Sequence, residues 1–111
     1  TRSKMNNEVI SQLKRKLLSF NSLLDQFNAG VLKIKGEIEL KKDAKKVHST
    51  LTKQHKDIKT IIERLEEIQQ SESWKGESAK NALDKATEKV NSFLDFAIDG
   101  LIRMIRILKN S

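Results

Sequence analysis

The apolar residues of this chain recur in alternating steps of three and four, and this spacing restricts the fold more than any other feature. The first run comprises Ile10, Leu13, Leu17, Phe20, Leu24, Phe27, Val31, Ile34 and Ile38. Such a pattern places apolar side chains along one face of an α-helix, as in a coiled coil. The chain contains no proline, so every residue keeps the backbone N–H that a helix uses. We therefore expect an all-α protein.

Two further runs follow the first with the same spacing. The second is Leu40, Ala44, Val47, Leu51, Gln54, Ile58, Ile61, Leu65 and Ile68, and the third is Ala79, Leu83, Ala86, Val90, Phe93, Ala97, Leu101, Met104 and Leu108. Between residues 93 and 108 the third run is apolar on nearly every side, so more than one helix must cover it. Either the N-terminal segment folds back to complete a three-helix bundle, or another protein supplies the missing helices.

The connections between the runs define the expected organisation. The first two runs belong either to one kinked helix of roughly 65 residues or to two helices separated by a turn at Asn28-Ala29-Gly30. A second break lies at Trp74-Lys75-Gly76. We expect an antiparallel helical hairpin with a long or folded-back N-terminal helix, and hence an elongated hairpin or a three-helix bundle. The single domain spans residues 5–111, divided into an N-terminal helix (5–38), a central helix (40–72), a turn (73–76) and a C-terminal helix (77–109).

The polar residues do not form a recognisable reaction centre. The chain lacks cysteine, a Ser-His-Asp pattern and a phosphate-binding glycine loop. On one helix His48 and His55 are ~10 Å apart along the axis and cannot share a metal ion, so we expect both to face solvent. Asp99 and Arg103 have the spacing of a helical ion pair. We predict a non-enzymatic protein with no cofactor and no metal.

The net charge of +7 is unevenly distributed. Residues 41–59 hold seven lysines against two aspartates: Lys41, Lys42, Lys45, Lys46, Lys53, Lys56 and Lys59 against Asp43 and Asp57. No aromatic residue is interleaved for base stacking and no helix-turn-helix spacing is present, which favours a solvated face or an acidic protein partner over nucleic acid. The apolar face at 93–108 also fits a helix on a membrane surface. Burial in a bundle is favoured over membrane binding because the other runs match it.

The stretch Ser73-Trp74-Lys75-Gly76-Glu77-Ser78-Ala79, flanked by two helical runs, resembles the WXG (early secreted antigen-like) family of type VII-secreted helical hairpins. The resemblance covers about residues 40–109. In that family the tryptophan and glycine form the hairpin bend, and the tryptophan belongs to a composite secretion signal. The resemblance implies these roles for Trp74 and Gly76.

The chain departs from this family in two respects. More than 70 residues precede the motif, which is similar to the longer α-helical accessory proteins that bind the helical N-terminal domain of LXG toxins for export. The family's second signal, an aromatic residue followed four positions later by an acid, is missing. Ala97 follows Phe93 at that spacing, and Gly100 follows Phe96. Our hypothesis is that a partner supplies this element.

The resemblance implies a helical partner or targeting protein that binds an LXG-type toxin domain or a second small WXG-like protein, as a homo- or hetero-oligomer. The expected partner-binding residues are Leu17, Phe20, Leu24, Phe27, Phe93, Phe96, Leu101, Ile105 and Leu108. It also implies location in the bacterial cytoplasm and leaves open whether the chain is exported with its partner. Residues 1–8 lack the apolar core of a signal peptide. The alternatives are a structural or regulatory coiled-coil protein without a secretion role and a basic nucleic-acid-binding protein.

Overall fold

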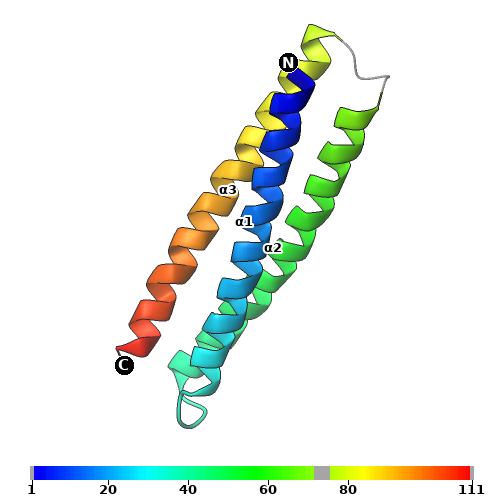
Figure 1. The fold of residues 1–111 in the computed structure, drawn as a ribbon. Coiled ribbons are helices and arrows are strands. Elements are labelled where there is room, and N and C mark those ends of the chain that lie inside the picture. Colours follow the sequence, from blue (N-terminus) through cyan, green and yellow to red (C-terminus); the bar gives the residue numbers. More distant parts are fainter. Residues whose placement is uncertain (1, 72–75, 111) are drawn as a thin grey trace.

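The computed structural model describes residues 2–71 and 76–110, whose regular elements are all helices: α1 (Arg2–Leu32), α2 (Glu39–Gln70) and α3 (Glu77–Lys109). They lie side by side in a bundle with extents of 57 × 19 × 16 Å. α1 and α3 run in the same direction and α2 runs against both (Figure 1). The N-terminus therefore lies beside the start of α3, and the C-terminus lies at the end that holds the α1–α2 loop. The N-terminal segment folds back, as one of the two predicted arrangements requires.

The chain first reverses in a loop that neither of the two alternatives, a kinked continuous helix or a turn at residues 28–30, had predicted. α1 continues through residues 28–30, and the chain reverses in residues 33–38. Gly36 has a φ of 77° in this loop, a conformation that favours glycine. The turn predicted at Asn28-Ala29-Gly30 was therefore wrong, as was a continuous helix. Val31 keeps the spacing of the first run because it is still in α1, whereas Ile38 precedes α2 and is 51% exposed.

α1 forms the centre of the core. Every member of the first run up to Val31 is buried, namely Ile10, Leu13, Leu17, Phe20, Leu24, Phe27 and Val31. α2 and α3 each contribute four buried residues: Ala44, Ile58, Ile62 and Leu65 from α2, and Val90, Leu94, Ala97 and Leu101 from α3. α1 packs extensively against both of the other helices, which touch each other much less. The N-terminal helix is thus an integral part of the fold.

The buried face of α2 differs from the predicted run at one position. Ile62 is 1% exposed, while Ile61, which was assigned to the run, is 41% exposed. Ile58, Ile62 and Leu65 preserve the helical steps of four and three, so both choices satisfy the period. The position of α1 selects Ile62.

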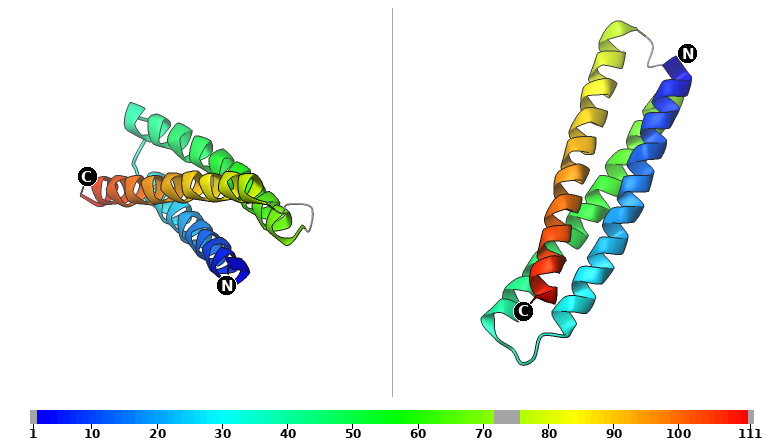
Figure 2. Two further views of the ribbon diagram at one scale, coloured as in Figure 1. Left: turned by 90° about the horizontal axis from the view of Figure 1, so that it is seen from above. Right: turned by 60° about the vertical axis from the view of Figure 1, so that its left-hand side comes forward.

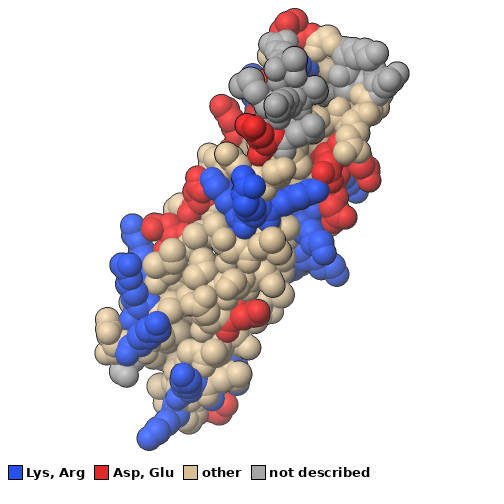
Figure 3. Space-filling model, viewed as in Figure 1, with Lys and Arg blue, Asp and Glu red and all other residues tan. Residues whose placement is uncertain are grey.

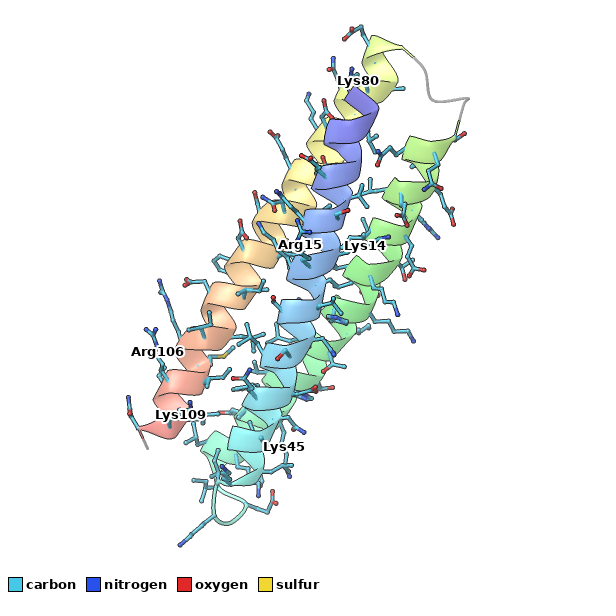
Figure 4. All side chains as sticks on the ribbon, in the orientation of Figure 1. Lys14, Arg15, Lys45, Lys80, Arg106 and Lys109 are labelled. Carbon is cyan, nitrogen blue, oxygen red and sulfur yellow. The ribbon has the colours of Figure 1, made fainter. Side chains whose placement is uncertain are left out.

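Two lysines of α1 tie it to its neighbours on either side. The Nζ of Lys14 lies 2.6 Å from Oε2 of Glu66 on α2, and Figure 4 shows Lys14 on the side of α1 next to that helix. The Nζ of Lys16 lies 2.7 Å from Oδ1 of Asp95 and donates a 2.5 Å hydrogen bond to Oδ1 of Asn91, both on α3. Since 14 and 16 are two residues apart on a helix, their side chains diverge toward different partners.

The ends of α3 carry charges that suit the helix dipole. Glu77 lies in the first turn, and Arg106 and Lys109 lie in the last turn.

Within the described part of the chain, none of the helices combines the length and the apolar content needed to cross a membrane.

Candidate helix-docking surface

An apolar groove separates α2 from α3 at the end of the bundle that holds the α1–α2 loop. It encloses about 190 Å³ and is lined by Phe27, Leu40, Asp43, Ala44, Val47, Met104, Ile107 and Leu108. Phe27 and Ala44 are buried in the core and form its floor. Leu40, Val47 and Ile107 form its walls and are 46%, 37% and 62% exposed. We call this feature the α2–α3 groove.

The face that contains the groove continues along both helices. From Asp43 and Val47, steps of three and four lead along α2 to Thr50, Gln54, Asp57 and Ile61. From Ile107, the same steps lead back along α3 to Arg103, Gly100, Phe96, Phe93 and Lys89. Phe96 is the most exposed large apolar residue of this face, at 82%. α2 and α3 run antiparallel (Figure 2), and the two series continue the sides of these helices that border the groove.

Gly100 lies near the middle of this surface. A Cβ atom added there would meet no other atom within 4 Å. A glycine within a helix costs about 1 kcal/mol relative to alanine, and the packing of the single chain does not require it. A small residue in an apolar surface allows the backbone of another helix to approach closely.

Charged residues lie at both edges of this surface. Asp43 and Asp57 lie on the α2 edge, fourteen residues apart, and Lys89 and Arg103 lie on the α3 edge, also fourteen residues apart. All four residues are exposed. Arg103 pairs with Asp99 of its own helix at 3.2 Å, which confirms the predicted helical ion pair. Among the described residues no ion pair joins the α2 edge to the α3 edge.

A second hollow lies on the other side of the last turn of α3, between α3 and α1. It encloses about 300 Å³ and is lined by Gln26, Ala29, Gly30, Lys33, Ile105, Leu108 and Lys109. Leu108 contributes to both hollows, so the last turns of α3 are only partly covered on either side. Figure 3 shows basic side chains predominating toward this end of the molecule and acidic ones toward the other.

The structure divides the predicted partner-binding residues into two groups. Leu17, Phe20, Leu24, Phe27 and Leu101 are buried by the chain's own helices. Phe93, Ile105 and Leu108 are half-buried against the core, and Phe96 is exposed. Only the second group has surface to offer to another protein while the bundle is folded.

The predicted secretion-motif turn lies partly outside the described residues, since Trp74 belongs to residues 72–75. Gly76 is described and precedes α3 with a φ of 114° and a ψ of 162°, a backbone conformation that is accessible almost only to glycine. A Cβ atom at Gly76 would meet no atom within 4 Å. Backbone conformation therefore accounts for the glycine here.

The two histidines do not face solvent, and that prediction was wrong. The His55 ring stands edge-on to Phe20, with centroids 5.4 Å apart, and the His48 ring lies tilted beside Phe27 at 6.4 Å. His48 and His55 are seven residues apart on α2, and Phe20 and Phe27 are seven residues apart on α1. Folding back of α1 brings its phenylalanines against the histidine-bearing face of α2.

The lysine stripe occupies the remaining face of α2. Lys42, Lys45, Lys46, Lys53, Lys56 and Lys59 are exposed, and Lys41 is half-buried. The Nζ of Lys45, labelled near the α1–α2 loop in Figure 4, lies 3.5 Å from Oε1 of Glu37. None of these lysines lines the α2–α3 groove.

Several groove residues were missed as contact residues, although four of them belong to the predicted runs. Leu40, Ala44, Val47 and Met104 have helical core spacing, and Ile107 was counted only as part of an apolar stretch. The packing of α3 against α1 rather than α2 leaves them accessible.

No family model, no curated protein and no solved structure matches the chain.

Proposed function

We propose that this protein is a non-enzymatic helix-binding protein whose α2–α3 groove and the face around it dock an amphipathic helix of another chain. The observations that carry the proposal are the exposed walls of the groove, Leu40, Val47 and Ile107. Phe96 is also exposed, and helical spacing puts it on the same side of α3 as Ile107. At about 25 cal/mol per Å² of apolar area, covering such side chains contributes several kcal/mol. A helix laid along this surface meets apolar residues at the spacing that helices use to recognise one another.

We further propose that the partner is exported by a type VII pathway, in keeping with the resemblance of residues 73–79 to the WXG family. Such a partner would be the long helical N-terminal region of an LXG-type toxin or a second small helical protein with an aromatic-to-acid signal. The positive φ of Gly76 supports this reading, because a bend glycine is what the motif requires. Trp74 then acts in export and the groove acts in partner binding.

Affinity capture from a nuclease-treated native lysate tests the binding step. The wild-type protein is compared with Phe96→Glu, which places a charge on the docking face. Leu18→Glu is the matched control, because Leu18 is 70% exposed on α1 and receives the same charge away from that face. We expect a helical partner to be retained by the wild-type and Leu18→Glu proteins and lost by Phe96→Glu. Equal retention by all three proteins contradicts docking at this face.

The export step needs a separate variant. Trp74→Ala should reduce secretion of the partner more than it reduces capture of the partner. Equal loss of both would assign Trp74 to folding or binding. Capture without any effect on secretion would support a coiled-coil protein that has no secretion role.

A second candidate function follows from the exposed lysines of α2, which offer a salt-sensitive contact to phosphates. If nuclease treatment abolishes all capture and the untreated protein retains nucleic acid, this face replaces the groove as the functional surface. A mobility shift at low and moderate salt, with Lys53→Glu as the variant, measures the contribution directly.

A further inference from the structure

We infer that the end of the bundle that carries the α1–α2 loop inserts into the surface of an anionic lipid membrane. The inference goes beyond the proposed function, because it assigns a second ligand and centres on the loop rather than on the α2–α3 groove. Exposed apolar side chains at the tip enter the boundary between the headgroups and the acyl chains, and the basic side chains around them contact the lipid phosphates.

The ends of all three helices meet at this part of the bundle. The hollow beside Gly30 joins the end of α1 to the end of α3, and the α2–α3 groove joins the start of α2 to the end of α3. We call residues 26–47 and 104–109, which include every residue that lines these two hollows, the loop end. The α1–α2 loop projects beyond the last turn of α3 in Figures 1 and 2. It is therefore the first part of the loop end to reach a flat surface.

Large apolar side chains at the loop end face solvent. Leu32, in the last turn of α1, is 62% exposed, and Ile38, just before α2, is 51% exposed. Neither of them lines the hollow beside Gly30 or the α2–α3 groove. Leu40 and Ile107 add exposed apolar surface on the adjoining turns of α2 and α3. Apolar side chains that gather at one end without packing in the core mark a site of protein or membrane contact.

The charge of the loop end matches an anionic surface. This end holds eight bases, Lys33, Lys35, Lys41, Lys42, Lys45, Lys46, Arg106 and Lys109, against three acids, Glu37, Glu39 and Asp43. All of these bases except Lys41 are exposed, and Figure 3 shows the basic side chains predominating toward this end. Among the described side chains of the opposite end, residues 8–18, 60–71 and 76–90 hold seven bases and seven acids. Electrostatic attraction therefore turns the loop end toward anionic lipid.

A lipid surface uses both the apolar and the basic side chains of the loop end, whereas the other ligands use only some of them. Nucleic acid would contact the lysines and leave Leu32 and Ile38 in water. A protein helix in the α2–α3 groove would cover Leu40 and Ile107, but Leu32 and Ile38 lie outside that groove. At a membrane surface, the burial of apolar area and the attraction between charges add to each other.

Co-sedimentation of the full chain with lipid vesicles tests the inference. We expect binding to vesicles that contain about a third phosphatidylglycerol, little binding to phosphatidylcholine alone, and weaker binding in added salt. Lys33→Gln/Lys35→Gln should lower the partition coefficient about tenfold or more, because each lost cation lowers it several-fold. Lys85→Gln/Lys89→Gln removes two exposed cations from the opposite end. This control should bind nearly like the wild type, because its charges lie far from the membrane.

Two leucines of α1 form a matched pair for measuring insertion. Leu32 and Leu18 are 62% and 70% exposed, but only Leu32 lies at the loop end. Leu32→Ser should lower the partition coefficient about tenfold, and Leu18→Ser should leave it unchanged. The chain has no cysteine, so Ile38→Cys and Leu18→Cys can each carry a single environment-sensitive fluorophore. Vesicles should shift the emission to the blue for the label at position 38 only. Circular dichroism verifies that every variant is folded.

Wild-type protein that does not bind the phosphatidylglycerol vesicles overturns the inference. Equal effects of the two lysine variants, or equal emission shifts for the two labels, overturn it as well. Binding that depends on the lysines but not on Leu32 also contradicts insertion, and a mobility shift would then identify nucleic acid as the ligand of the loop end. Capture of a helical partner is measured without vesicles, so the proposed function stands or fails independently of these outcomes.

Discussion

His55 on α2 presents the edge of its imidazole to the ring of Phe20 on α1, with an angle of 67° between the ring planes. Its Nε2 lies 3.2 Å from the carbonyl oxygen of Leu17. A carbonyl oxygen can only accept a hydrogen bond, so Nε2 carries the proton and donates it. A polar side chain therefore helps to hold the central helix against α2.

The two histidines of α2 form a matched pair for measuring this contribution. His55→Ala removes both the ring contact and the hydrogen bond, so we expect the free energy of unfolding to fall by about 1–2 kcal/mol. His48→Ala removes only the wider ring contact with Phe27 and should cost about half as much. Urea unfolding followed by circular dichroism measures both. A larger loss for His48→Ala would contradict the assigned hydrogen bond.

Phe20 belongs to the core, whereas Phe96 belongs to the proposed docking face. Phe20 is fully buried, so Phe20→Ala leaves a cavity and should lower the free energy of unfolding by about 3–5 kcal/mol. Phe96 is largely exposed, and Phe96→Ala should change the stability of the monomer by no more than about 0.5 kcal/mol. Thermal unfolding at low protein concentration tests this contrast. A strongly destabilised Phe96→Ala monomer would place Phe96 in the core.

Gly76 and Gly100 should respond in opposite directions to the same substitution. Gly76→Ala forces a side chain into a positive-φ conformation and should cost about 1–3 kcal/mol. Gly100→Ala adds a methyl group in open space within a helix and should stabilise the monomer by up to about 1 kcal/mol. The midpoints of thermal unfolding report both changes. Destabilisation by Gly100→Ala would show that the single chain already packs against this position.

The contacts of Lys16 bridge α1 and α3 at a partly exposed position. We expect the coupling free energy between Lys16 and Asp95 to be about 0.5–1 kcal/mol, because solvent screens the pair. A double-mutant cycle with Lys16→Met and Asp95→Asn measures it, and added salt should reduce it. Lys53→Met, on the outer face of α2, is the control and should have little effect. A coupling free energy near zero would leave the hydrogen bond with Asn91 as the main contact of Lys16.

Removal of α1 tests whether α2 and α3 can fold as a hairpin without it. A chain of residues 37–111 loses every buried residue that α1 contributes, and α2 and α3 contact each other sparsely. We expect low helicity and no cooperative unfolding transition, since helices of this length depend on tertiary packing in water. Addition of a peptide spanning residues 2–36 should restore helicity. A cooperatively folded fragment would contradict the central role of α1.

The sequence by itself determined the elements that depend on local periodicity. Absence of proline and the steps of three and four predicted three helical runs, and the whole first run up to Val31 forms the buried face of α1. The ion pair of Asp99 with Arg103 was also predictable, because residues four apart on a helix are neighbours whatever surrounds them. The excess of apolar residues near the end of α3 predicted that more than one helix covers it; α1 folds back onto α3, but Phe96 and Ile107 stay exposed.

Tertiary structure alone decided the features that depend on which helices meet. The chain reverses at residues 33–38 rather than at Asn28-Ala29-Gly30, and Ile62 is buried where the period equally allowed Ile61. The phenylalanines of α1 meet the histidines of α2, and Phe96 and Ile107 stay exposed because α3 packs mainly on α1. The period of a helix determines which residues share one of its faces, but it does not determine which neighbouring helix covers that face. That choice comes from the simultaneous burial of all three helices.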